Sequence, residues 1–67
     1  MEAAVAFKVT WTFGDDQSES RTFYDELEAR EEGYRLSHEY ATKYGRCEMQ
    51  LHKDGQLIID MRQTHCA

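Results

Sequence analysis

The chain of 67 residues lacks the features that mark several large classes of protein. Its two cysteines, Cys47 and Cys66, cannot form a dense disulfide framework, and its four scattered glycines do not form a phosphate-binding loop. No apolar stretch after Met1 is long enough for a signal peptide or a membrane span, so we expect a cytoplasmic protein with reduced cysteines. Basic residues are also few, since eight lysines and arginines face 13 acidic residues. The resulting net charge of −5 argues against binding to nucleic-acid phosphates.

The length fits a single domain, residues 1–67, and leaves no room for a second one. A hydrophobic content of 40% is ordinary for a folded protein and argues against disorder. A domain this small buries a modest share of its surface, so its stability margin is expected to be thin. A homodimer or a stable partner is therefore a natural expectation.

The first two expected strands, about residues 5–13 and 19–23, form a hairpin. A strict period of two marks the first strand, and its apolar positions are Val5, Phe7, Val9, Trp11 and Phe13. Residues 14–18 are typical turn formers. A five-residue turn would place Val9 opposite Phe23, with both side chains in the core.

One helix is expected over about residues 25–44. Asp25 is a typical N-cap residue and Gly45 a typical residue to end the helix. Residues at spacings of three and four predict a buried stripe of Ala29, Gly33, Leu36, Ser37, Tyr40 and Tyr44. Because a glycine in this stripe weakens the helix, Gly33 indicates a close approach of the helix to the sheet, over Trp11.

A second hairpin is expected after the helix, with strands at about residues 46–52 and 56–62. A two-residue turn at Asp54–Gly55 would place Asp60 opposite Met49 and carry a carboxylate into the core. We therefore predict a three-residue turn that includes Lys53 and has Gly55 left-handed. That turn would place Ile59 opposite Met49.

These elements predict an α+β fold of order ββαββ, with one helix packed on one face of a four-stranded antiparallel sheet. A helical crossover over the first strand predicts the spatial order 2-1-3-4. The fourth strand is then an edge strand with an unusually apolar sequence, in which Ile58 points to the open face of the sheet. An unprotected apolar edge recruits other strands, so a homodimer through this edge is one expected partnership.

Residues 22–58 resemble a small uncharacterised bacterial domain family in which a helix leads into a strand that ends in a glutamate, a histidine and an Asp-Gly turn. The matching positions here are Glu48, His52 and Asp54–Gly55. The resemblance implies a fold and no activity. The ββαββ layout also resembles small phage proteins that bind and inhibit host complexes, which implies an inhibitor as one possible role.

The sequence predicts neither a catalytic site nor a metal or cofactor site. Cys47 and His52 fall on opposite faces of their strand, and His65–Cys66 lies at the chain end, so zinc is not expected. Ser37 and His38 are neighbours on a helix, and their side chains diverge by about 100°. We therefore expect a protein without catalytic residues.

The acidic charge is concentrated between Asp15 and Glu32, where eight acidic residues face two arginines. One interpretation is a solvated surface that also suits the helix dipole. The other is a docking surface for a basic patch of a partner, with apolar contacts from Tyr34 and Ile58. The residues predicted to bind the partner are Asp15, Asp16, Glu19, Glu26, Glu28, Glu31, Glu32, Tyr34 and Ile58.

The leading hypothesis is a small acidic, non-catalytic protein-binding module that acts as an inhibitor or adaptor. A homodimerising structural domain is the first alternative. The second is a nucleic-acid-binding module that uses the open sheet face, where several polar residues gather: Lys8, Thr10, Thr12, Gln50, His52 and Arg62. The core-facing aromatic residues count against it, because sheets that bind RNA stack bases on exposed aromatic rings.

Overall fold

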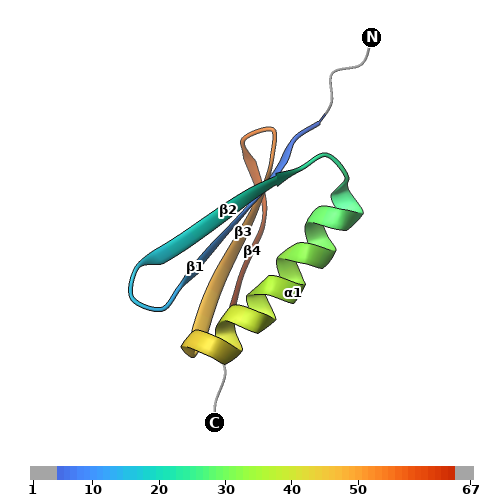
Figure 1. The fold of residues 1–67 in the computed structure, drawn as a ribbon. Coiled ribbons are helices and arrows are strands. Elements are labelled where there is room, and N and C mark those ends of the chain that lie inside the picture. Colours follow the sequence, from blue (N-terminus) through green and yellow to red (C-terminus); the bar gives the residue numbers. More distant parts are fainter. Residues whose placement is uncertain (1–4, 65–67) are drawn as a thin grey trace.

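The computed structural model, which describes residues 5–64, is a four-stranded antiparallel sheet covered on one face by one helix (Figure 1). The elements follow in the order β1 (Phe7–Phe13), β2 (Gln17–Phe23), α1 (Glu26–Tyr44), β3 (Arg46–Lys53) and β4 (Gln56–Thr64). The strands lie in the order β2-β1-β3-β4, so β1 and β3 are central. The predicted fold class, order of elements and strand order are confirmed.

Alternation along β1 and β3 builds the core beneath the helix. Every second residue of these strands is buried against α1, and the intervening residues face away from it. The buried hydrophobic side chains are Phe7, Val9, Trp11 and Phe13 of β1, Cys47, Met49 and Leu51 of β3, and Ala29, Leu36 and Ala41 of α1. Since one face is buried and the other is polar, the sheet has the usual character of an antiparallel sheet with one solvated face.

The helix has the caps that its sequence predicts. The Asp25 side chain accepts a hydrogen bond of 3.1 Å from the backbone N–H of Glu28. At the other end Gly45 is left-handed, with φ +89°, and its N–H donates to the carbonyl of Ala41. Both contacts satisfy backbone groups that the helix ends would otherwise leave unpaired.

The helix lies close to the sheet at Gly33, as its place in the stripe predicts. A Cβ atom on Gly33 would lie 2.8 Å from the Sδ atom of Met49. The indole N–H of Trp11 donates a buried hydrogen bond of 3.0 Å to the carbonyl of Gly33. A side chain at position 33 would therefore push the helix away from both core residues.

The buried stripe differs from the predicted one at its C-terminal end. Ala41 is buried, whereas Tyr40 is half-buried and Tyr44 is 38% exposed. The ring of Phe13 stacks on Tyr40 at 4.2 Å between centroids and packs on Tyr44 at 4.8 Å. The two tyrosines thus cover the end of β1, and Tyr44 remains partly exposed.

The first hairpin has a shorter turn than predicted, and its register moves by two residues. Phe13 pairs with Gln17, and Phe23 lies opposite Phe7 instead of Val9. The turn, residues 14–16, contains left-handed Gly14 and Asp16, with φ near +60°. This tighter turn adds ladder pairs to the hairpin, and an even shift leaves every side chain on its predicted face.

The second hairpin has a two-residue turn, so the predicted three-residue turn is wrong. Asp54 and Gly55 form a two-residue turn with φ of 49° and 83°, the left-handed pair that suits a tight hairpin, so Gly55 is left-handed as predicted. A bulge then places Ile58 outside the regular pairing, because His52 lies opposite Leu57 and Leu51 opposite Ile59.

The bulge changes which β4 residues face the helix. It places Met61 opposite Met49 and keeps Asp60 on the open face, opposite Gln50. The predicted pairing of Met49 with Ile59 is therefore wrong. Leu57, which the three-residue turn would have placed on the core side, is 46% exposed.

Candidate functional site

The acidic segment is divided between the two ends of the sheet (Figure 1). Asp15 and Asp16 lie in the β1–β2 turn, at the end where the helix finishes beside Phe13. Glu26 and Glu28 lie in the first helical turn, and a helix of 19 residues spans about 28 Å. The predicted acidic residues therefore do not form one continuous surface.

Glu19 lies between these ends, on the helix side of β2. Its carboxylate accepts a hydrogen bond from the hydroxyl of Tyr40 and lies 3.5 Å from the Nε atom of Arg21. The hydrogen bond to Glu19 is the main reason that the pKa of Tyr40 rises to about 12, and burial adds to the rise. Glu19 thus joins β2 to the helix, a structural role that its position in the sequence does not reveal.

The contact between Tyr40 and Glu19 predicts an alkaline loss of stability. Because the folded-state pKa lies above the ordinary value of 10.0, this stabilisation is complete below about pH 10 and is lost as the pH rises to about 12. We expect Tyr40→Phe to reduce that loss, measured as the change in urea midpoint between about pH 8 and about pH 11. Tyr34→Phe, which alters an exposed ring, is the control and should retain the full loss. An equal loss in both variants would contradict the assignment.

Arginines of the helix neutralise several of its acidic residues. Arg30 Nη2 lies 3.4 Å from Glu26 Oε2, one turn earlier. Arg35 Nη2 lies 2.7 Å from Glu32 Oε2, and Arg35 Nη1 lies 3.4 Å from Glu39 Oε2. The hydrogen bond from Arg35 lowers the pKa of the Glu32 carboxyl. These exposed pairs reduce the charge that Glu26 and Glu32 offer to a partner.

Exposed apolar and acidic side chains lie just before α1 and along its first half. Tyr24 is 70% exposed, Leu27 63% and Tyr34 43%. Glu28 and Glu31 are exposed between them, and neither has a basic group within 4.0 Å among residues 5–64. Leu27, Glu31 and Tyr34 follow one another at spacings of four and three, so they share one face of the helix. We call these five residues the helix-start surface.

The helix-start surface contains three of the residues predicted from the sequence to bind a partner, Glu28, Glu31 and Tyr34. Tyr24 and Leu27 were not predicted. An apolar residue outside the buried stripe is the signal that could have identified Leu27. Leu27 lies two positions before Ala29, which places it on a different face of the helix from the stripe. Ile58, also predicted, lies at the β4 bulge and is 39% exposed.

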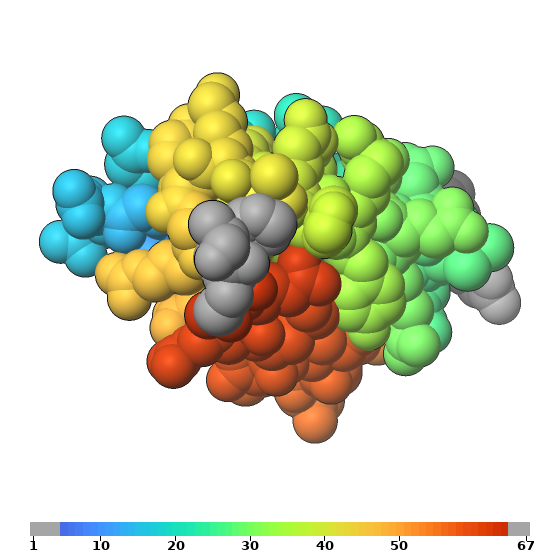
Figure 2. Space-filling model, turned by 90° about the horizontal axis from the view of Figure 1, so that it is seen from below, coloured from blue at the N-terminus to red at the C-terminus, as the bar shows by residue number. Residues whose placement is uncertain are grey.

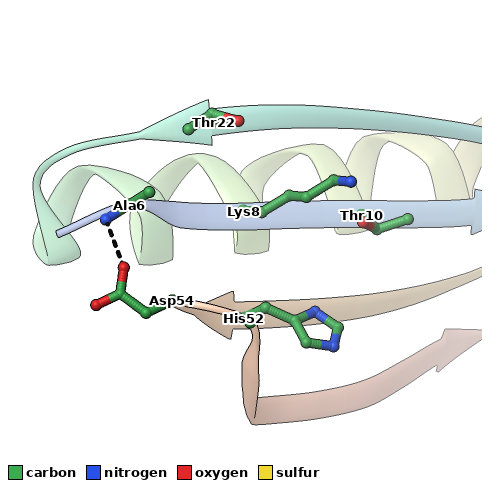
Figure 3. A pocket seen from close by; sticks show the side chains of 7 residues that line it. Ala6, Lys8, Thr10, Thr22, His52 and Asp54 are labelled. Carbon is green, nitrogen blue, oxygen red and sulfur yellow. Dashed lines mark hydrogen bonds between the residues drawn. The ribbon is translucent and has the colours of Figure 1, made fainter.

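The open sheet face carries a shallow hollow of about 430 Å³ near the β3–β4 turn (Figure 3). Its lining consists of Ala6, Lys8, Thr10, Thr22, His52, Asp54 and Gly55. Asp54 is held in place there, because its side chain accepts a hydrogen bond from the Ala6 N–H and its own N–H donates to the Ala6 carbonyl. Among the lining residues only His52 has an aromatic ring, so the hollow lacks the series of aromatic rings on which successive bases of single-stranded nucleic acid stack.

The residues considered as zinc ligands are separated by the sheet. Cys47 is buried on the helix side, where burial raises the pKa of its thiol, and His52 lies on the open face. Within the part of the chain that the structure describes, no three histidine, cysteine, aspartate or glutamate residues gather into a metal-binding group. His65 and Cys66 lie outside the described residues.

Comparisons of the chain with protein-family models, with curated proteins and with solved structures find no match. The resemblance of residues 22–58 to a bacterial domain family, and of the layout to phage inhibitors, stays an expectation from the sequence. No helix within residues 5–64 has both the length and the apolar character needed to cross a membrane.

Proposed function

We propose that this chain is a small acidic, non-catalytic module that binds a basic surface of a larger protein and acts as an adaptor or inhibitor. The helix-start surface is the observation that carries the proposal. It combines exposed aromatic and aliphatic side chains with two carboxylates that have no basic group within 4.0 Å in the described chain.

Each part of this surface has a physical role in the proposal. Tyrosine is enriched in interfaces because its ring buries a large apolar area and its hydroxyl can still hydrogen-bond. Tyr34 and Leu27 would supply this anchoring contact. Glu28 and Glu31 would meet lysines or arginines of the partner, and the net charge of −5 would accelerate the encounter at low ionic strength.

Asp15 and Asp16 have a smaller part in the proposal than the sequence suggested. They lie in the β1–β2 turn, at the end of the molecule where α1 finishes, so a compact contact at the helix start would not include them. At physiological salt, charges separated by more than about 8 Å of solvent are largely screened. These aspartates would therefore assist the approach of a basic partner at low salt and contribute little to the bound state.

The first experiment is capture of partners from a host lysate with the tagged chain, followed by washes at rising salt and identification of bound protein and nucleic acid. A defined protein with a basic surface, released by salt, is the expected result. Recovery of nucleic acid alone would support the open-face alternative and contradict the proposal. Recovery of the chain alone would favour a homodimerising structural domain.

Matched variants then test the surface with the purified partner. Glu31→Lys and Asp15→Lys change the net charge equally, at opposite ends of the molecule. We expect Glu31→Lys to weaken binding about tenfold at physiological salt and Asp15→Lys to change it less than about twofold. Tyr34→Ala should increase the dissociation rate. Equal effects of the two charge reversals would show that net charge alone, and not the helix-start surface, governs binding.

A further inference from the structure

The outer edge of β4 is a second surface, and it is independent of the proposed protein-binding site. Among the strands of residues 5–64, β4 pairs only with β3 and lies at the end of the strand order. Figure 2 shows its orange and red residues along one rim of the molecule, beside the helix and away from the β1–β2 turn in blue. An edge strand presents a row of unpaired backbone N–H and C=O groups to any strand that approaches it.

Beyond the bulge at Ile58, β4 is a regular strand whose two faces differ. Ile59 and Met61 lie on the helix side, half-buried and packed against the core. Asp60 and Arg62 are exposed on the open face, opposite Gln50 and Glu48 of β3. A regular pleat with no proline over this stretch is suited to pairing with another strand.

The two charged residues of this stretch differ in their partners within the chain. Arg62 contacts Glu48, with Nη2 at 2.9 Å and Nε at 3.1 Å from the same carboxylate oxygen, and its side chain remains 70% exposed. A guanidinium has five N–H donors, so Arg62 can bind a second carboxylate. Asp60 has no basic group within 4.0 Å among residues 5–64, although Arg62 is only two positions away.

We propose that β4 pairs antiparallel with β4 of a second copy, with the two-fold axis at Met61. Residues directly opposite in an antiparallel ladder point to the same face, and their numbers add to a constant. An axis at Met61 makes that sum 122, which places Asp60 of each copy opposite Arg62 of the other. Two ion pairs form on the open face, and the sheet continues from one copy into the next.

Neighbouring registers do not have this complementarity. An axis at Asp60 places the two Asp60 carboxylates opposite each other, and an axis at Arg62 does the same with the two guanidinium groups. Like charges directly opposite destabilise a ladder. In the Met61 register the helix side pairs Met61 with its own copy and Ile59 with Gln63, so half-buried apolar groups at the edge become covered. A second copy of β4 is therefore the strand whose charges complement those of Asp60 and Arg62.

Charge-swapped variants test this register. All proteins carry Glu48→Gln, so that Arg62→Asp does not face a carboxylate of its own chain. Asp60→Arg alone and Arg62→Asp alone create like-charge pairs, whereas an equimolar mixture of the two regains two opposite-charge pairs in the heterodimer. Sedimentation from about 1 µM to about 1 mM spans the range in which weak dimers dissociate, and far-UV circular dichroism verifies that each variant folds.

We expect each single variant to weaken self-association at least about tenfold, and the mixture to associate within about threefold of the Glu48→Gln protein. A monomeric Glu48→Gln protein over the whole range would overturn the proposal. Association of Asp60→Arg as strong as that of the background, or no gain in the mixture, would also overturn it.

A cysteine on the axis provides a second test that needs no charge change. In a Cys66→Ser background, Met61→Cys should form an intermolecular disulfide with its own copy on mild oxidation, because the axis places the two thiols face to face. Gln63→Cys is the matched control, since its opposite residue is Ile59 of the second copy. Equal cross-linking of the two variants would overturn the Met61 register.

Discussion

Replacing Trp11 with phenylalanine should lower the free energy of unfolding by about 2–3 kcal/mol. Trp11 is fully buried in the centre of the core, and its indole N–H donates to the carbonyl of Gly33. Phenylalanine loses this hydrogen bond and leaves a cavity where the larger ring was. A domain of 67 residues has a stability of about 3–10 kcal/mol, so the variant would lose a large part of its margin.

Urea unfolding followed by far-UV circular dichroism measures this change, because Trp11 is the only tryptophan and its fluorescence is lost in the variant. Tyr34→Phe is the control, since the Tyr34 ring is exposed and should change stability by less than about 0.5 kcal/mol. If Trp11→Phe had as small an effect as the control, the hydrogen bond from sheet to helix would not contribute to stability.

Gly33→Ala should be destabilising by about 1–2 kcal/mol, although alanine favours a helix over glycine by about 1 kcal/mol. The added Cβ atom would lie 2.8 Å from Met49 Sδ and 3.5 Å from Val9 Cγ1. Met49 and Val9 are fully buried, so neither side chain has free space into which to move. Overpacking against the sheet therefore outweighs the gain in helix propensity.

A double-mutant cycle with Met49→Val separates these two effects, because valine has no atom at the position of the methionine sulfur. In the Met49→Val background we expect Gly33→Ala to become neutral or to stabilise by up to about 1 kcal/mol, as helix propensity alone predicts. Urea midpoints of the four proteins provide the measurement. If Gly33→Ala has the same cost in both backgrounds, the contact with Met49 is not its cause.

Both predictions concern the same feature, the short distance between α1 and the centre of the sheet. Gly33 lets the helix approach, Trp11 donates a hydrogen bond to the buried carbonyl of Gly33, and Met49 fills the space where a side chain would lie. Close packing lets a single helix seal the core of four strands, because α1 is the only element on that face among residues 5–64.

The hairpin registers could not be read from the sequence because two different registers place the same residues on the same face. In the first hairpin, moving the pairing by two residues exchanges Val9 for Phe7 opposite Phe23 and leaves the core pattern intact. In the second, the sequence pattern seemed to require a longer turn to keep Asp60 out of the core. A bulge at Ile58 also keeps Asp60 on the open face. The position of a bulge cannot be recognised reliably from a single sequence.

The candidate surfaces were harder to predict from the sequence than the fold was. A run of acidic residues in the sequence predicted one acidic surface, but β2 carries the chain along the full length of the sheet between Asp16 and Glu26. Arginines one helical turn away then neutralise part of the remaining charge. The sequence pattern already placed Asp60 and Arg62 on the open face, and the structure adds the contact of Arg62 with Glu48 and the position of β4 at the edge of the sheet.

The sequence by itself determined the class and order of the elements, the helix caps at Asp25 and Gly45, and the close approach at Gly33, because these depend on local periodicity and on the special properties of single residues. The tertiary structure decided the two registers, the role of Glu19 beside Tyr40, and the exposure of Tyr24, Leu27 and Tyr34. These features depend on which residues distant in sequence meet in space, and that choice is made by the packing of the whole sheet against its helix.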